Sequence, residues 1–156
     1  MNIYEKLISL KEQEDKNIIP EFHLIGPLET IDSINQIEKS KNVKLPEDYK
    51  KILIDVGVGT LEGEGSTISF FSVDDLMNHP LSATGILKNA FTFASDFGGN
   101  YYFFDVNNES RRGKFSIFMV YPGNPLWEDS IYITGNISSL IEKIIEGDNF
   151  TDYKKG

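Results

Sequence analysis

The spacing of hydrophobic residues changes character near the middle of the chain, and this change constrains the fold most. Up to residue 57, apolar side chains recur at helical spacing. The clearest stripe, at positions i, i+3, i+4 and i+7, is formed by Tyr49, Ile52, Leu53 and Val56. Between Thr67 and Thr134, short runs rich in Thr, Ile, Phe, Tyr and Val alternate with polar turns, as in strands. Strands that follow one another without long intervening helices favour an antiparallel sheet.

The order of these segments predicts an α+β domain, a twisted antiparallel sheet with helices packed mainly on one face. The length of 156 residues suits one domain, and we assign residues 1–156 to it. Within it, residues 1–29 are expected to form an N-terminal helical extension, and residues 152–156 a frayed tail. The expected helices cover about residues 3–14, 46–56, 74–78 and 137–145. A further helix is expected to begin between residues 30 and 33. The expected strands cover residues 67–73, 91–94, 101–106, 114–121 and 131–134, and a turn is expected at 122–125.

Composition excludes several classes of function. The chain has no cysteine, which rules out disulfides, thiolate nucleophiles and cysteine metal sites. It shows neither a signal peptide nor an apolar run of the roughly 20 residues that span a bilayer, so a cytoplasmic protein is expected. The net charge of −9 opposes binding to nucleic acids and anionic membranes and favours a basic partner, although acidity also serves solubility.

One segment carries a recognisable motif. It runs from Ile37-Glu38 through Leu45-Pro46 and Tyr49 to the glycine-rich turn Gly57-Val58-Gly59. This order resembles the signature of the SUKH superfamily, which includes the SMI/KNR cell-wall-synthesis regulators of fungi and many bacterial proteins. The family pattern is an acidic residue in one helix, then "LP" and "Y", then a hydrophobic helix that ends in glycine.

Two further segments match the same family in the same order. Phe93-Ala94-Ser95-Asp96 and Gly99–Asp105 are similar to its pattern of an apolar residue, Asp, a Gly followed by Asp or Asn, and an aromatic strand with a closing Asp. Asn100 stands where many relatives have Asp, so no charge is inferred there. The third match is the terminal strand, turn and helix at 131–145.

The resemblance implies a role in binding proteins without catalysis. Bacterial SUKH proteins are similar to immunity proteins that protect a cell from polymorphic toxins, often nucleases. Fungal relatives look like regulatory scaffolds in signalling to the cell wall. We therefore expect an immunity protein for a cognate toxin, with a regulatory interaction module as the alternative. A third hypothesis, that the chain is an enzyme or a ligand-binding domain, would require a pocket lined by converging polar groups.

A search for catalytic or metal-binding patterns supports the same expectation. His23 and His79 lie far apart in sequence with no ligand-type spacing, so neither a metal site nor a cofactor is expected. The acid pairs Asp74-Asp75 and Glu128-Asp129 resemble a glycosidase pair only in residue type, and Asp74-Asp75 suits a helix N-terminus better. Arg111-Arg112 is interpreted as a solubilising hairpin tip.

The candidate binding surface consists of acids expected in loops around the sheet, together with the single tryptophan. Trp127 either packs in the core or anchors a partner, because tryptophan is enriched at interface hot spots. The predicted partner-binding residues are Glu62, Glu64, Asp74, Asp75, Asp96, Trp127, Glu128 and Asp129. An acidic face of this kind can occupy the substrate site of a nuclease by imitating phosphate charge.

Overall fold

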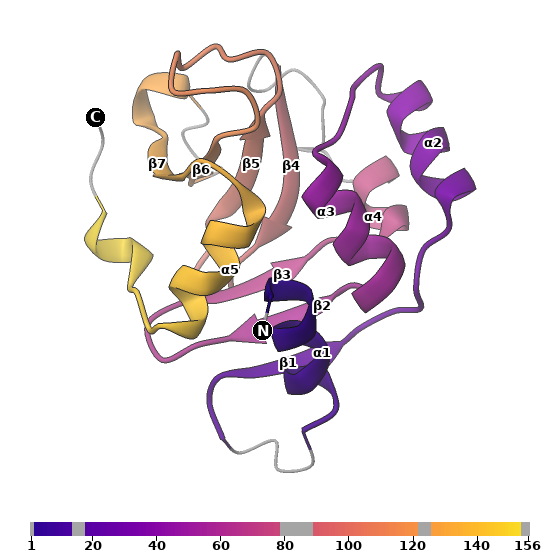
Figure 1. The fold of residues 1–156 in the computed structure, drawn as a ribbon. Helices are drawn as coiled ribbons and strands as arrows, with labels where there is room; N and C mark the ends of the chain where they lie inside the picture. Colours follow the sequence, from indigo (N-terminus) through magenta and orange to yellow (C-terminus); the bar gives the residue numbers. More distant parts are fainter. Residues whose placement is uncertain (1, 14–17, 79–88, 122–125, 154–156) are drawn as a thin grey trace.

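The strands pair in the order in which they follow along the chain, so the sheet is a meander (Figure 1). The computed structural model describes residues 2–13, 18–78, 89–121 and 126–153. Within these residues every strand pair is antiparallel, as predicted. The seven strands are β1 (Glu21–Leu24), β2 (Gly59–Glu62), β3 (Thr67–Phe70), β4 (Ala90–Ser95), β5 (Tyr101–Asp105), β6 (Ile117–Val120) and β7 (Ile131–Thr134).

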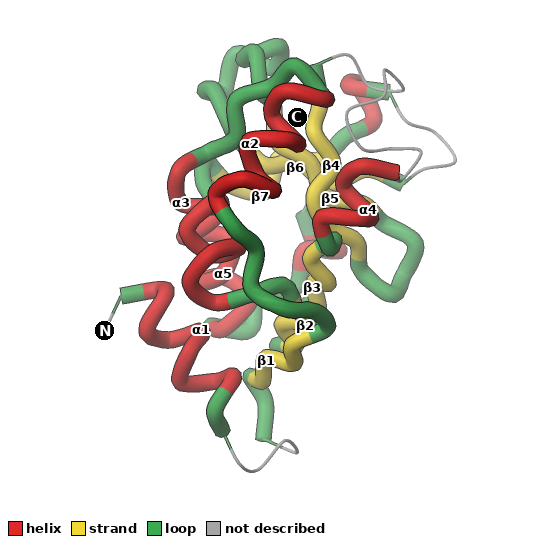
Figure 2. Tube along the Cα trace, turned by 90° about the vertical axis from the view of Figure 1, so that its right-hand side faces the viewer, coloured by secondary structure: helices red, strands yellow, loops and turns green. Residues whose placement is uncertain are grey.

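Helices α1, α3 and α5 cover one face of the sheet, while α4 stands apart from them beside β4 and contacts α2 (Figures 1 and 2). The α-helices are α1 (Ile3–Lys11), α2 (Ile31–Ser40), α3 (Glu47–Lys51), α4 (Val73–Asn78) and α5 (Ile137–Ile145). Three shorter turns complete the described elements, a π-helical turn η1 (Ile52–Val56) and two 3₁₀ turns, η2 (Trp127–Asp129) and η3 (Phe150–Asp152). The α+β class and the one-sided helical layer are confirmed.

Alternate residues of the strands face two different layers. On the helix-covered face, Phe93 and Phe104 stack with ring centroids 4.1 Å apart, and the fully buried Tyr49 of α3 packs edge-on against Phe104. On the outer face, β1–β3 present polar side chains, whereas β4–β6 carry a small apolar cluster that includes Phe103 and Phe118. Strands β4–β6 are therefore buried on both faces, which explains their near-continuous apolar runs.

Two strands, β1 and β2, were not predicted. Residues 1–29 are not helical throughout, because Glu21–Leu24 forms β1, an edge strand that pairs with β2. Phe22 is fully buried beneath this edge and α1 contacts β1, so tertiary packing rather than local pattern stabilises the strand.

At the other terminus, η3 includes Asp152, and the Tyr153 hydroxyl donates to Asp148, so the packed chain continues into the predicted tail. The predicted turn at 122–125 lies outside the described residues.

The buried hydroxyl of Tyr49 has no hydrogen-bond partner among the described residues. Burial also raises the pKa of this phenol well above its ordinary value, so the side chain stays neutral. Tyr49→Phe should therefore stabilise the protein by about 1 kcal/mol, because it removes a polar group that was desolvated without compensation. Tyr153→Phe is the matched control, since its hydroxyl bonds Lys143 and Asp148, and should cost about 0.5–1 kcal/mol. Urea denaturation measures the change in free energy of unfolding for each variant. Equal destabilisation by the two substitutions would contradict the account.

Candidate functional site

The antiparallel meander gathers three connections at one end of the sheet. Strands β2, β4 and β6 run toward this end and β3, β5 and β7 leave it, so the described residues 63–66, 96–100, 121 and 126–130 lie there. We call this the acidic end. The predicted residues brought to it are Glu62, Glu64, Asp96, Trp127, Glu128 and Asp129.

Asp74 and Asp75 do not join this group. They are exposed in the first turn of α4, which follows the opposite end of β3. The hydroxyl of Ser72 accepts from the backbone N–H of Asp75 at 3.2 Å, so a serine caps this helix, and the acids add favourable charge. Their positions therefore suit a helix start.

The carboxylate of Asp96 organises the β4–β5 turn. It accepts hydrogen bonds from the backbone N–H groups of Gly98 and Asn100 at 2.7 and 3.0 Å and from the Asn100 side-chain amide at 3.1 Å. Gly99 adopts φ of +90°, a conformation that favours glycine. The turn holds Phe97 in solvent, 80 % exposed beside a carboxylate. The sequence interpretation assigned Asp96 to the surface but missed Phe97, because exposure of an aromatic residue depends on the turn geometry.

The β2–β3 turn rests against the C-terminal end of α5 and the segment after it. A Cβ on Gly65 would lie 2.3 Å from the carbonyl oxygen of Gly147, so the two backbones are in close contact. The Ser66 hydroxyl accepts from the backbone N–H of Phe150 at 2.9 Å. This packing adds the carboxylates of Glu146, Asp148 and Asp152 to the acidic end.

A small hollow joins this packing to the β4–β5 turn. It has a volume of about 220 Å³ and lies between the two turns. Its lining includes Gly65, Thr67, Asp96, Phe97 and Phe150.

Trp127 is half-buried and serves mainly as a packing residue. Its ring meets Phe103 and Phe118 edge-on, with centroids 5.1 and 5.4 Å apart, and covers the apolar cluster on the outer face. Its neighbours on the same connection are more accessible: Tyr121 is 61 % and Leu126 47 % exposed. A Cβ on Gly99 would lie 3.1 Å from the Tyr121 ring, so the two connections touch.

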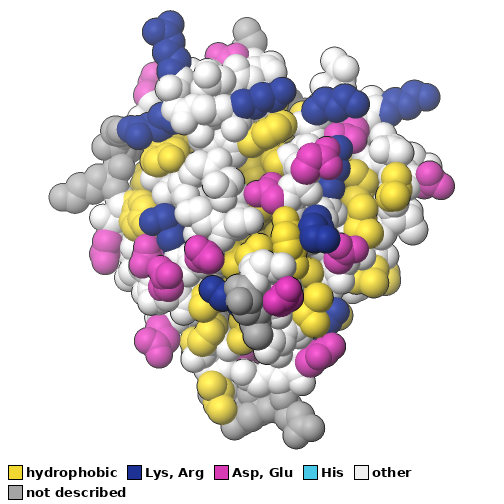
Figure 3. Space-filling view, in the orientation of Figure 1, with side chains coloured by type: hydrophobic (Ala, Val, Ile, Leu, Met, Phe, Trp, Pro, Cys, Tyr) yellow, Lys and Arg dark blue, Asp and Glu magenta, His cyan; other side chains and the backbone are white. Residues whose placement is uncertain are grey.

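The opposite end of the molecule carries positive charge. Figure 3 shows Lys and Arg side chains along the top of the view, where α2 ends and the β5–β6 connection lies, and acidic side chains concentrated lower on the left. A groove of about 680 Å³ opens at this end. The basic residues that line it are Lys39, Lys41, Lys44 and Lys114. The net charge of −9 does not reveal that positive and negative side chains lie at opposite ends, because it sums the charges of both.

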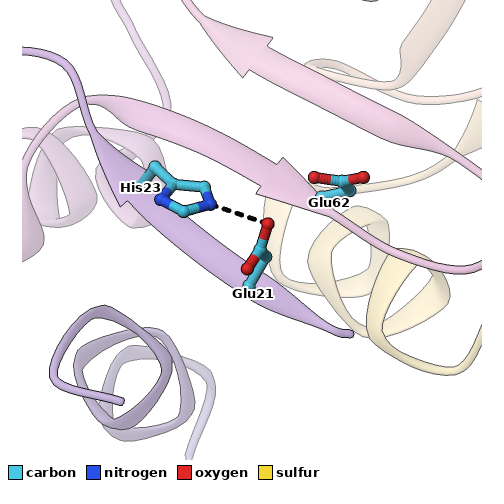
Figure 4. A group of neighbouring side chains, drawn as sticks. All are labelled: Glu21, His23 and Glu62. Carbon is cyan, nitrogen blue, oxygen red and sulfur yellow. Dashed lines mark ion pairs between the residues drawn. The ribbon is translucent and has the colours of Figure 1, made fainter. Parts of the chain in front are cut away.

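Three side chains of types that can bind a metal, two glutamates and one histidine, lie together on the outer face of β1 and β2 (Figure 4). Glu21 and His23 are two residues apart on β1, and Glu62 is the direct cross-strand partner of Glu21. The sequence interpretation placed His23 in no site, because the ligand set exists only in the register of two strands.

The motif from Glu38 to Tyr49 has a structural explanation. Oε2 of the buried Glu38 accepts from the backbone N–H of Leu45 at 2.7 Å and from Nζ of Lys50 at 3.0 Å, which fixes the loop between α2 and α3. Residues 29–153 match the model of the SMI1 / KNR4 family (SUKH-1), which is most of the chain. The chain belongs to this family. No curated protein matches it in the corresponding search.

Membership in SUKH-1 agrees with the sheet, the α2–α3 motif and the terminal strand and helix described above. Residues 1–28, which contain α1 and β1, precede the matched region. Among the residues that the structure describes, no helix is long and apolar enough to cross a membrane.

Proposed function

We propose that this SUKH-1 domain is a non-catalytic, cytoplasmic immunity protein that binds and neutralises a toxin domain with a basic surface. The observation that carries the proposal is the acidic end, where the exposed Phe97 lies in the same turn as the carboxylate of Asp96. An exposed aromatic side chain on a surface with charged residues is a common composition for an interface anchor with a polar rim.

The dimensions of the acidic end suit a protein partner. Its connections extend over about four strand spacings, from the β2–β3 turn to the β6–β7 connection, or roughly 19 Å. An interface of standard size, about 800 Å² on each partner, covers such a span. Carboxylates there attract a basic catalytic domain at long range and speed association, and Phe97 then provides apolar contact.

The second candidate function is a regulatory interaction module, and the basic groove favours it. Four lysines and several asparagine side chains line this groove, a composition that suits an acidic segment of another protein. In that case the acidic end would serve solubility, and the partner would bind at the opposite end of the sheet. The same groove is the place to look for a small anionic ligand.

Co-purification tests the immunity proposal. The tagged protein is mixed with the product of the neighbouring gene at low and moderate salt, and toxicity of that product is measured with and without the protein. A tight one-to-one complex that abolishes toxicity is expected, with weaker association at higher salt because the attraction is electrostatic. A stable partner without toxic activity would favour the regulatory module, and the absence of any complex would sink the immunity proposal.

A further inference from the structure

The outer face of β1 and β2 presents an imidazole and two carboxylates to one point in space. Residues two apart on a strand share a face, so Glu21 and His23 project together from β1. Glu62 lies directly opposite Glu21 on β2. One ligand atom from each of the three residues lies within 4.8 Å of the others (Figure 4).

The electrostatics of this group favour a cation. Like charges that face each other directly across a strand pair destabilise a sheet, and Glu21 and Glu62 occupy such a pair. Glu21 is only 7 % exposed, so water screens its charge poorly. Nε2 of His23 lies 2.7 Å from Oε1 of Glu21, which keeps the imidazole nitrogen on the side of the carboxylates.

We propose that Glu21, His23 and Glu62 bind a divalent transition-metal ion of the zinc class. The imidazole nitrogen and one oxygen from each glutamate would supply three ligands, and water would complete the coordination. Ligand atoms around a tetrahedral zinc ion lie about 3.4 Å apart for bonds near 2.1 Å. The present spread, up to 4.8 Å, reaches this geometry through side-chain rotations. An imidazole in the set favours zinc over Ca²⁺ and Mg²⁺, which prefer oxygen ligands.

The position of the three ligands gives the ion a structural role. Glu21 and His23 lie on the edge strand β1, before the region that matches the family, whereas Glu62 lies within that region. A bound ion would therefore fasten the N-terminal segment, with α1 and β1, to the family domain. The proposed ion does not require the proposed toxin binding, but Glu62 belongs to both the metal cluster and the acidic end.

Titration calorimetry and thermal unfolding with Zn²⁺, Mg²⁺ or Ca²⁺ test the site in the full chain. The unsubstituted protein should bind one Zn²⁺ ion, and its Tm should rise by about 5–10 °C at a hundredfold excess over Kd. Glu62→Gln should have two opposite effects: a higher Tm without metal, because the facing charges are relieved, and loss of the zinc-induced rise. His23→Gln should also lose the rise, and circular dichroism establishes that each variant is folded.

Two controls separate this site from general binding to acids or histidine. Glu64→Gln removes a nearby exposed carboxylate, and His79→Gln removes the only other histidine, which lies outside the described residues. Both should bind zinc as the unsubstituted protein does. The proposal is overturned if the unsubstituted protein binds no zinc, if Glu62→Gln and His23→Gln retain full affinity, or if Mg²⁺ gives the same rise as Zn²⁺.

Discussion

Glu38→Ala should destabilise the protein by about 3–5 kcal/mol. The side chain is 8 % exposed, and one of its oxygens accepts from both the Leu45 backbone and the Lys50 ammonium group. Alanine would leave the buried backbone N–H of Leu45 and a lysine whose side chain is only 19 % exposed without this partner. Loss of one member of a buried ion pair costs most, because the remaining charge keeps its desolvation penalty.

Glu47→Ala is the matched control for this prediction. Glu47 pairs with the same ammonium group at 3.3 Å, but its side chain is 91 % exposed. Its loss should cost about 0.5 kcal/mol or less, because water screens the pair. Urea denaturation compares the two variants with the unsubstituted protein. Similar destabilisation by both substitutions would show that the ion pair with Lys50, rather than the buried hydrogen bond from Leu45, dominates the effect.

Asp105→Ala should cost about 3 kcal/mol or more. The carboxylate is completely buried at the end of β5. It accepts from the backbone N–H groups of Glu109 and Ser110 at 2.8 and 2.9 Å and from the Ser110 hydroxyl at 2.6 Å. Charge-assisted bonds of this kind contribute about 1.5–3 kcal/mol each, and the substitution leaves the donors of Glu109 and Ser110 without their acceptor.

Asp96→Ala tests whether burial causes this cost. Asp96 also accepts three hydrogen bonds, from two backbone N–H groups and one side chain, but in a turn that water reaches. Its loss should cost about 1 kcal/mol, because water replaces the bonds. Denaturation of both variants provides the comparison. A larger loss of stability for Asp96→Ala than for Asp105→Ala would contradict the account.

The sequence predicted the elements whose pattern is strong over many residues. The stripe from Tyr49 to Val56 and the aromatic run of β5 lie where they were expected. β1 and β2 were missed because they are four residues each and contain charged or glycine residues that carry no strand pattern. Phe22 of β1 pairs with Leu61 of β2, and both side chains are fully buried. This pairing shows which side of the two strands faces the core.

The sequence predicts which residues of the candidate site lie together only where it predicts the direction in which each strand runs. Once strands β2 to β7 form a meander, alternate connections must meet at one end, which brings Glu64, Asp96 and Glu128 to the same side. Asp74 and Asp75 fall outside it because they follow a strand that runs the other way. Phe97, the basic groove and the cluster around His23 depend on turn geometry and register, which a single sequence does not specify.

The affinity of the protein for its toxin partner, measured for charge variants at the two ends, tests the central claim most directly. Glu64→Lys with Glu128→Lys should slow association about tenfold, and Phe97→Ser should weaken binding about thirtyfold. Glu47→Lys, a charge reversal at a side chain that is 91 % exposed and shares a hollow with Lys114 of the basic groove, should leave the affinity within about twofold. Unchanged binding by the acidic-end variants would contradict the account. Tighter binding by Glu47→Lys would place an acidic partner at the basic groove instead.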